Sequence, residues 1–190
     1  MKINSKLYMV IPVERDDGTK VFVHAAPISR EVFESYYLVI AKTFSSLYQE
    51  GLGVTSGPRV AAMALKRIAE EMGIWKGDVG VERGLVMEIE RLCNVLAPGS
   101  RGWEPIPLRE AIHRQILDSD DASEVINAIT FFSVAYSVHK KTDREAILKA
   151  ASGFWGAQIV LLDCTAYSVS LQTLTGTEIL QPRVVSSVPS

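Results

Sequence analysis

Three histidines and two cysteines are the side chains of this 190-residue chain best suited to metal binding or nucleophilic chemistry. The histidines are His24, His113 and His139, and each belongs to a different predicted element. None has a second histidine or a cysteine at the short spacing of a zinc site, so the sequence predicts no metal site. Cys93 or Cys164 could pair with a histidine as nucleophile and base. Both lie on apolar faces of predicted helices, where a thiol is usually inert, so we interpret them as reduced, buried thiols of a cytosolic protein.

The glycine-rich segment at residues 51–57 has the composition of a phosphate-binding loop. It follows a predicted helix and lacks the Lys-Ser or Lys-Thr ending of a Walker motif, so a helix breaker explains it better. Six acidic residues could supply an acid and base pair, but they cluster at the ends and outer faces of predicted helices, where capping and solubility explain them. They are Glu70, Glu71, Asp118, Asp120, Asp121 and Glu124. The sequence therefore predicts no enzyme, no catalytic residue and no cofactor.

A line of small residues is the most informative surface feature of the chain. Its members recur at helical spacing in the last predicted helix, and such a face lets another backbone approach closely. They are Ala146, Ala150, Gly153 and Ala157. A helix of the same subunit or another copy of the chain could pack there. Trp103 and Trp155 are candidate interface anchors by residue type, or else core residues. These six residues are the predicted partner or self-association surface.

The overall composition restricts the class of partner. A formal net charge of -2 supplies no basic field for nucleic acid or for an anionic membrane. Hydrophobic residues make up 47% of the chain, which suggests surface buried in a homo-oligomer, although a well-filled core also explains it. The longest apolar stretch contains Lys149, Gln158 and Asp163, so we expect no membrane-spanning segment. The N-terminus shows no secretory signal.

The elements that position these residues begin with a β-hairpin. Residues 7–14 and 20–25 are rich in β-branched and aromatic residues, and they flank a turn with an Asp-Gly sequence. Pro12 removes one backbone donor and predicts an edge strand. A lone hairpin is only marginally stable. We therefore expect residues 1–27 to be a hairpin appendage that lies on the helices or pairs with a neighbouring strand.

Residues 28–99 predict three amphipathic helices. Ser29 is the expected N-cap of the first helix, and Asp78 is the expected N-cap of the third. The third helix has inward-facing apolar residues as far as Leu96. Residues 100–107, rich in Gly and Pro, are the one extended connector. This connector joins the first half of the chain to the second.

Residues 108–174 predict a short helix followed by two long core helices. The first core helix opens with acids at Ser119 and closes with bases near His139, as the helix dipole favours. The second opens with a Thr-x-x-Glu capping box at Thr142 and continues to about Leu171. Because both are apolar on most of their circumference, they should form an antiparallel pair covered by other helices or by other copies.

The predicted fold is mainly α with an N-terminal β-hairpin, as a compact bundle of about six helices. The hairpin covers residues 1–27 and the helical domain covers residues 28–174. Residues 175–190 turn to Thr, Gly, Ser, Val and Pro, which predicts a mobile tail.

Several segments of the chain resemble the tail assembly chaperones of long-tailed bacteriophages. The N-terminal hairpin is followed by amphipathic helices and by a connector Gly-Trp-Glu-Pro-Ile-Pro-Leu at residues 102–108. A helix then carries Phe-Phe-Ser-Val-Ala at residues 131–135. The closing segment Ser-Leu-Gln-Thr-Leu-Thr-Gly-Thr-Glu-Ile at residues 170–179 resembles the Thr-rich ending of that family. The well-developed hairpin departs from the most purely helical members.

The resemblance implies a protein that coats the tape measure protein, keeps it soluble and leaves as tail tube subunits polymerise around it. It implies no enzyme, a place in the host cytoplasm during assembly and absence from the mature virion. In such families a longer form often arises by frameshifting near the C-terminus. The alternative from the sequence is a structural virion subunit, such as a neck or tail completion protein, whose hairpin adds to a neighbour's sheet. A third possibility is a small helical enzyme or regulator with a site that no motif reveals.

Overall fold

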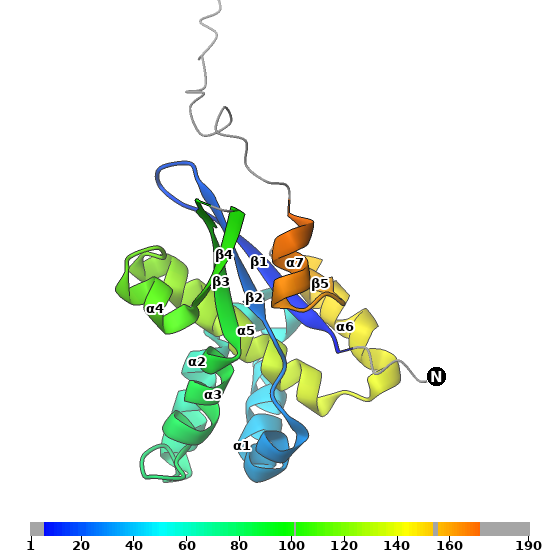
Figure 1. Ribbon diagram of the computed structural model, residues 1–190. Coiled ribbons are helices and arrows are strands. Elements are labelled where there is room, and N and C mark those ends of the chain that lie inside the picture. The colour runs from blue at the N-terminus through cyan, green and yellow to red at the C-terminus, as the bar shows by residue number, and fades with distance from the viewer. Residues whose placement is uncertain (1–5, 101, 154–155, 172–190) are drawn as a thin grey trace, which may run out of the picture.

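The computed structural model describes residues 6–100, 102–153 and 156–171, and within them the chain forms a five-stranded antiparallel sheet with helices on both faces (Figure 1). The strand order is β4-β3-β2-β1-β5. The strands are β1 (Tyr8–Glu14), β2 (Lys20–Ala25), β3 (Cys93–Gly99), β4 (Gly102–Pro107) and β5 (Gln158–Val160). The predicted tail at residues 175–190 lies outside the described residues. The many helices and the N-terminal strands are present as expected, but the fold is mixed α and β, because a five-stranded sheet takes the place of the predicted helical bundle with a lone hairpin.

The helices are α1 (Arg30–Gln49), α2 (Gly53–Glu71), α3 (Met87–Arg91), α4 (Leu108–His113), α5 (Ser119–Val138), α6 (Lys141–Gly153) and α7 (Cys164–Ser170), with a π-helical turn η1 (Glu82–Val86) that leads directly into α3. The predicted cap at Ser29 is confirmed, because its hydroxyl accepts the Val32 N–H at 3.2 Å. At the start of α5, Asp118 accepts the backbone N–H groups of Asp120 and Asp121. Polar side chains thus satisfy free donors where these two long helices begin.

The predicted N-terminal hairpin is confirmed. Glu14 pairs with Lys20, and the Arg15 N–H donates to the Thr19 carbonyl at 2.9 Å. Gly18 adopts φ +78°, a conformation that glycine tolerates and that a three-residue turn of this kind requires. The expected pairing with a neighbouring strand is also confirmed, since β2 pairs with β3 and β1 pairs with β5, so the hairpin is part of a sheet and not an appendage.

The last residues of the third predicted helix and most of the predicted connector are strands. Helix α3 ends at Arg91, β3 follows at once, and β4 returns along it with Gly99 paired to Gly102. The apolar residues in this segment fit a helical period and a strand period equally well. Pairing with β2 favours the strand, because β3 then buries Val95 and Leu96 on opposite sides of the sheet.

The long helix predicted from Thr142 to about Leu171 is wrong in its second half. Helix α6 ends at Gly153, β5 then pairs with β1, and α7 is a separate short helix. Asp163 caps α7, accepting the Ala166 N–H at 2.8 Å. The Asp163 carboxylate is therefore exposed at the start of a helix and does not lie inside an apolar helix.

The two faces of the sheet are covered very differently. One face, here called the core face, carries residues such as Val21, Val23 and Val95 and packs on the main helical layer, in which α5 contacts α1, α2 and β1. The opposite face, here called the α7 face, carries Val10 and Leu96 outside the main core. Figure 1 shows α5 behind the strands and α7 in front of them.

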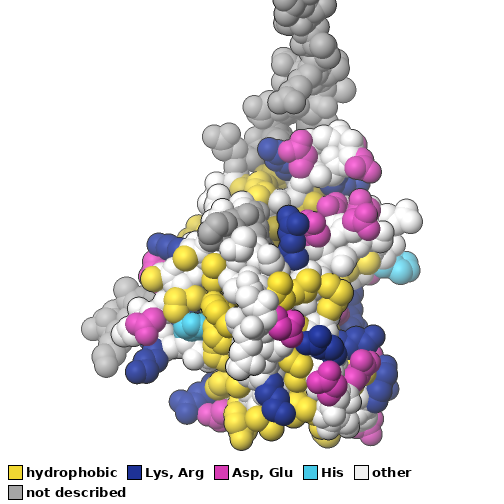
Figure 2. Space-filling view, turned by 180° about the vertical axis from the view of Figure 1, so that it is seen from behind, with side chains coloured by type: hydrophobic (Ala, Val, Ile, Leu, Met, Phe, Trp, Pro, Cys, Tyr) yellow, Lys and Arg dark blue, Asp and Glu magenta, His cyan; other side chains and the backbone are white. Residues whose placement is uncertain are grey.

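Figure 2 views the molecule from behind, on the side of the helical layer. Hydrophobic side chains are concentrated in the lower half of this view and charged side chains lie among them. The exposed hydrophobic residues of α1 and α2 include Tyr37, Leu38, Tyr48 and Met63. Scattered exposed apolar side chains of this kind are normal on a protein surface.

Candidate binding site

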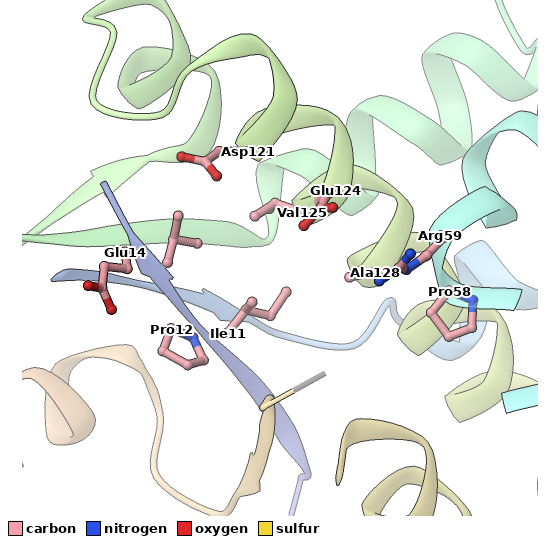
Figure 3. A pocket seen from close by; sticks show the side chains of 10 residues that line it. Ile11, Pro12, Glu14, Pro58, Arg59, Asp121, Glu124, Val125 and Ala128 are labelled. Carbon is pink, nitrogen blue, oxygen red and sulfur yellow. The ribbon is translucent and has the colours of Figure 1, made fainter. Parts of the chain in front are cut away.

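A hollow of about 280 Å³ opens between the outer edge of β1 and the helices α2 and α5 (Figure 3). We call it the β1 groove. Its walls come from three segments that are far apart in the sequence. The lining residues are Ile11, Pro12, Val13, Glu14, Pro58, Arg59, Asp121, Glu124, Val125 and Ala128. The charged side chains of Arg59, Asp121 and Glu124, here called its rim, come from α2 and α5. Glu14 points away from these helices (Figure 3).

The edge of β1 that borders the groove has no strand beside it in the described part of the chain. Strand β5 pairs with Tyr8, Met9 and Val10 only. Because the Arg15 N–H bonds to Thr19, the alternation of an antiparallel ladder directs the backbone groups of Pro12 and Glu14 away from β2, toward this open side. Proline has no N–H, so the edge offers the Pro12 carbonyl and both backbone groups of Glu14. The expectation that Pro12 marks an edge is confirmed for this part of β1.

Acidic side chains dominate the charge of the groove. Burial and the nearby carboxylates of Asp118, Asp16, Glu124 and Asp120 raise the pKa of Asp121 above its usual value. Neither Asp121 nor Glu124 forms an ion pair with any described residue. Burial is the largest cause of the raised pKa, and repulsion between like charges adds to it, because both disfavour the ionised carboxylate. The site therefore favours a cationic ligand group.

The lining of the groove contains few kinds of polar group. Its lining contains no histidine, cysteine or hydroxyl side chain that could act as a nucleophile or as an imidazole base. Within the described ranges, no three side chains of His, Cys, Asp or Glu are placed so that they could hold a metal ion. What the lining does offer is apolar surface, carboxylate acceptors and an open strand edge.

The predicted partner surface of small residues lies elsewhere and is interrupted. Ala146, Ala150 and Gly153 are exposed on α6, so no other described helix covers them. Ala157 is buried and follows the end of α6, so it does not share their face. The intramolecular helix crossing weighed from the sequence is therefore absent here, and a role in self-association stays a prediction.

Of the two tryptophans in the predicted partner surface, Trp103 can be placed in the fold. Trp103 lies on β4, is partly buried, and packs edge-on against Phe22 with ring centroids 5.2 Å apart. Trp155 lies outside the described residues. The structure thus joins Trp103 to the α7 face and not to the β1 groove.

The histidines and cysteines do not form a catalytic pair. Cys93 is buried in the core, where its thiol donates to the Ile89 carbonyl and burial raises its pKa strongly. Burial also raises the pKa of the partly buried Cys164. In the described part of the molecule neither thiol is hydrogen-bonded to a histidine, and a thiol held in its protonated form is a poor nucleophile.

His24 is buried on the α7 face. Its Nε2–H donates to the Leu162 carbonyl at 3.0 Å, and its ring lies 5.1 Å from that of Tyr8 and 5.9 Å from that of Tyr167. Burial lowers its pKa, opposed by the Leu162 bond and by Asp163. His24 is therefore a neutral packing residue that fastens the segment before α7 to the sheet.

Sequence reasoning missed the β1 groove. Asp121 and Glu124 were assigned to capping, but Asp118 is the residue that caps α5. The segment at residues 51–57 does end α1, since Gly51 adopts φ +74° just beyond it, but the segment also begins α2, where Gly57 leaves room for the Phe131 ring of α5. Pro12 was the one sequence signal of the open strand edge.

No protein-family model, no curated protein and no solved structure matches this chain. Every helix in the described ranges falls short of the length or the apolar character needed to cross a lipid bilayer.

Proposed function

We propose that this chain is a non-enzymatic, protein-binding chaperone of bacteriophage tail assembly, which binds the tape measure protein and keeps it soluble. The observation that carries the proposal is the β1 groove. It combines apolar lining residues with a strand edge that no described strand pairs, and both features suit the binding of a polypeptide. A groove of this kind recognises polypeptide by backbone hydrogen bonds and inserted side chains.

The sequence resemblance supports the same role. Two of the segments that carry it are described: residues 102–107 form β4, and residues 131–135 lie in α5 at the centre of the core. Most of the Thr-rich ending lies outside the described residues. The fold is less helical than the resemblance implies, since β3 and β4 extend the hairpin into a sheet.

The proposal includes several partners and a location. The tape measure protein is the client, the tail tube protein is a second contact, and the exposed small residues Ala146, Ala150 and Gly153 are a surface for self-association. Assembly would take place in the host cytoplasm, and the mature virion would lack the protein. Several weak grooves offered by an oligomer hold a long client more tightly than one groove does.

Co-expression with the tape measure protein encoded nearby tests the role. We expect the soluble fraction of the client to rise severalfold when this chain is present, and the two proteins to co-elute. A client that is equally insoluble with and without this chain would refute the proposal. An unrelated helical protein expressed at the same level is the control for nonspecific solubilisation.

A structural virion subunit is the second candidate, and the outer edge of β4 favours it. Strand β4 is the last strand of the sheet on that side, so it could pair with a strand of a neighbouring subunit. The hairpin itself is a poor donor for such pairing, because β2 lies between β1 and β3. Mass spectrometry of purified particles separates the candidates, since a virion subunit is present in fixed copy number and a chaperone is absent.

A further inference from the structure

We propose that the β1 groove binds an extended peptide segment that places one lysine or arginine side chain in the hollow. The inference rests on the proposed protein-binding role and names the chemistry of the partner. It follows from the strand register, from the walls of the hollow and from the charge at its rim.

The strand register defines where an added segment would lie. Strand β5 occupies the outer side of β1 as far as Val10, so the next free position beside β1 is opposite residues 11–14. Side chains opposite each other in an antiparallel pair point to the same face of the sheet. A residue placed opposite Val13 would therefore point to the core face, as Val13 does, and enter the hollow.

The walls of the hollow fit a long side chain with an apolar stem and a charged head. Ile11, Val13, Val125 and Ala128 supply apolar surface for methylene groups (Figure 3). Lysine and arginine bury such a stem while the charged head stays at a polar rim. The rim offers carboxylates from α5, at Asp121 and Glu124, that no described residue neutralises.

The charge balance of the groove selects against other ligands. Glu14 is paired with Lys20, but Asp121 and Glu124 still outnumber the one cationic lining residue, Arg59, so an anionic peptide or a nucleic acid would be repelled. A cationic head between the carboxylates would relieve the mutual repulsion that, after burial, contributes to the raised pKa of Asp121. The groove therefore combines a geometric reason for one inserted side chain with an electrostatic reason for its charge.

Pro12 limits how much backbone pairing the segment can gain. A full strand partner would find a donor missing at Pro12, so it could bond to the Pro12 carbonyl and to the two backbone groups of Glu14. Few backbone bonds favour a weak, reversible contact. A valine at this position would restore one outward donor at the edge.

Fluorescence anisotropy with synthetic peptides tests the inference on the full chain. The probe is a labelled peptide of alternating Val and Thr with one central Lys, and its matched peptides carry Glu or norleucine at that position. We expect the Lys peptide to bind at least about tenfold more tightly than either, with affinity falling as salt rises. Equal binding of all three peptides, or no binding of the Lys peptide, would overturn the inference.

Variants of the groove make the test specific. The double variant Asp121→Asn with Glu124→Gln should weaken Lys-peptide binding about tenfold or more, since both carboxylates are lost. Glu31→Gln, an exposed acid in the first turn of α1, is the matched control and should leave binding unchanged. A double variant that keeps its far-ultraviolet circular dichroism spectrum but binds as the wild type does contradicts the assigned rim. Pro12→Val should tighten binding about threefold to tenfold through one added hydrogen bond, and an unchanged affinity contradicts the extended orientation.

The peptide assay tests the groove inference, and the co-expression assay tests the chaperone role, independently of each other. If the chain keeps the tape measure protein soluble but binds no Lys peptide, the groove inference is wrong and the chaperone role stands. If the peptides bind as expected while the client stays insoluble, the groove inference stands and the chaperone role is wrong.

Discussion

The two faces of the sheet bury side chains equally well under covers of very different size. On the core face, Val23 is 0% exposed beneath a layer that includes α1, α2 and α5. On the α7 face, Val10 is 1% exposed, yet the seven residues of α7 include no buried residue. A seven-residue helix is too short to be stable by itself and depends on the contacts that hold it to the sheet.

This difference indicates where the molecule can open without unfolding. Tyr167 packs against Phe22 and His24, and His24 bonds to the Leu162 carbonyl. Few contacts therefore hold α7, whereas many helices share the core face. Local opening of a weakly held element costs less free energy than unfolding of the core. Each prediction below compares one face with the other.

The largest contrast is expected between two aromatic side chains. Phe132 is buried on the core side and Tyr167 is partly buried on α7. Phe132→Ala should lower the free energy of unfolding by about 3–5 kcal/mol, because it leaves a cavity in the main core. Tyr167→Ala should lower the free energy of unfolding by about 1–2 kcal/mol, because the short helix α7 can shift toward the sheet and fill the space that the side chain leaves. Urea denaturation measures both, and equal losses would contradict the comparison.

The two thiols report opening of the two faces without any change in packing. Cys93 is part of the main core and Cys164 begins α7. Labelling with a chromogenic disulfide should modify Cys164 at least about 100-fold faster than Cys93. Local opening of α7 exposes Cys164, whereas only global unfolding exposes Cys93. In Cys164→Ser the fast phase should disappear and the slow phase should persist. A single labelling rate for both thiols would show that α7 opens only with the core.

A matched pair of valines gives a smaller contrast. Val23→Ala should cost about 2–3 kcal/mol of unfolding free energy, through lost apolar burial and a residual cavity. Val10→Ala removes the same atoms on the other face and should cost about 1 kcal/mol, because α7 can move into the space. The difference between the two urea midpoints measures the effect. A Val10→Ala loss as large as that of Val23→Ala would mean that α7 is as rigid as the helical layer.

The smallest effect is a dependence of stability on pH that comes from the α7 face. Burial lowers the pKa of His24, so the folded protein takes up this proton less readily than the unfolded chain does. Stability should therefore be full above the ordinary histidine pKa of about 6.5 and fall below it, by at most about 1.4 kcal/mol per pH unit. The groups that oppose the shift are the Leu162 carbonyl and Asp163.

The variant His24→Gln isolates this contribution. Its side-chain amide can still donate to the Leu162 carbonyl but does not titrate. The difference in unfolding free energy between wild type and variant should change between about pH 7.5 and about pH 5. A difference that is constant with pH would exclude His24 as the source.

The local features of the fold were accessible from the sequence. The N-terminal hairpin follows from β-branched residues around Asp-Gly, and the cap at Ser29 precedes a clear amphipathic helix. The apolar helix that became α5 was also expected at residues 119–138. These signals act over a few residues, so no distant contact is needed to read them.

The candidate site was not accessible in the same way. The β1 groove is lined by Val13 of β1, Glu124 of α5 and Pro58 of α2, and no short motif links residues so far apart in the sequence. Asp121 reads as an ordinary helix-start acid until its neighbours in space are known. Only the packing of β1 on two helices reveals the carboxylates without partners.

The sequence by itself determined a chain with one strong hairpin, several amphipathic helices and no motif for a reaction. The tertiary structure decided that residues 93–99 and 102–107 are strands and that the last long helix breaks into α6, β5 and α7. The physical reason is that apolar segments such as Val95–Ala97 can bury themselves as helix or strand, and the hydrogen bonds of a neighbouring strand decide between them. The same pairing leaves β1 open beyond Val10, and this open edge creates the candidate site.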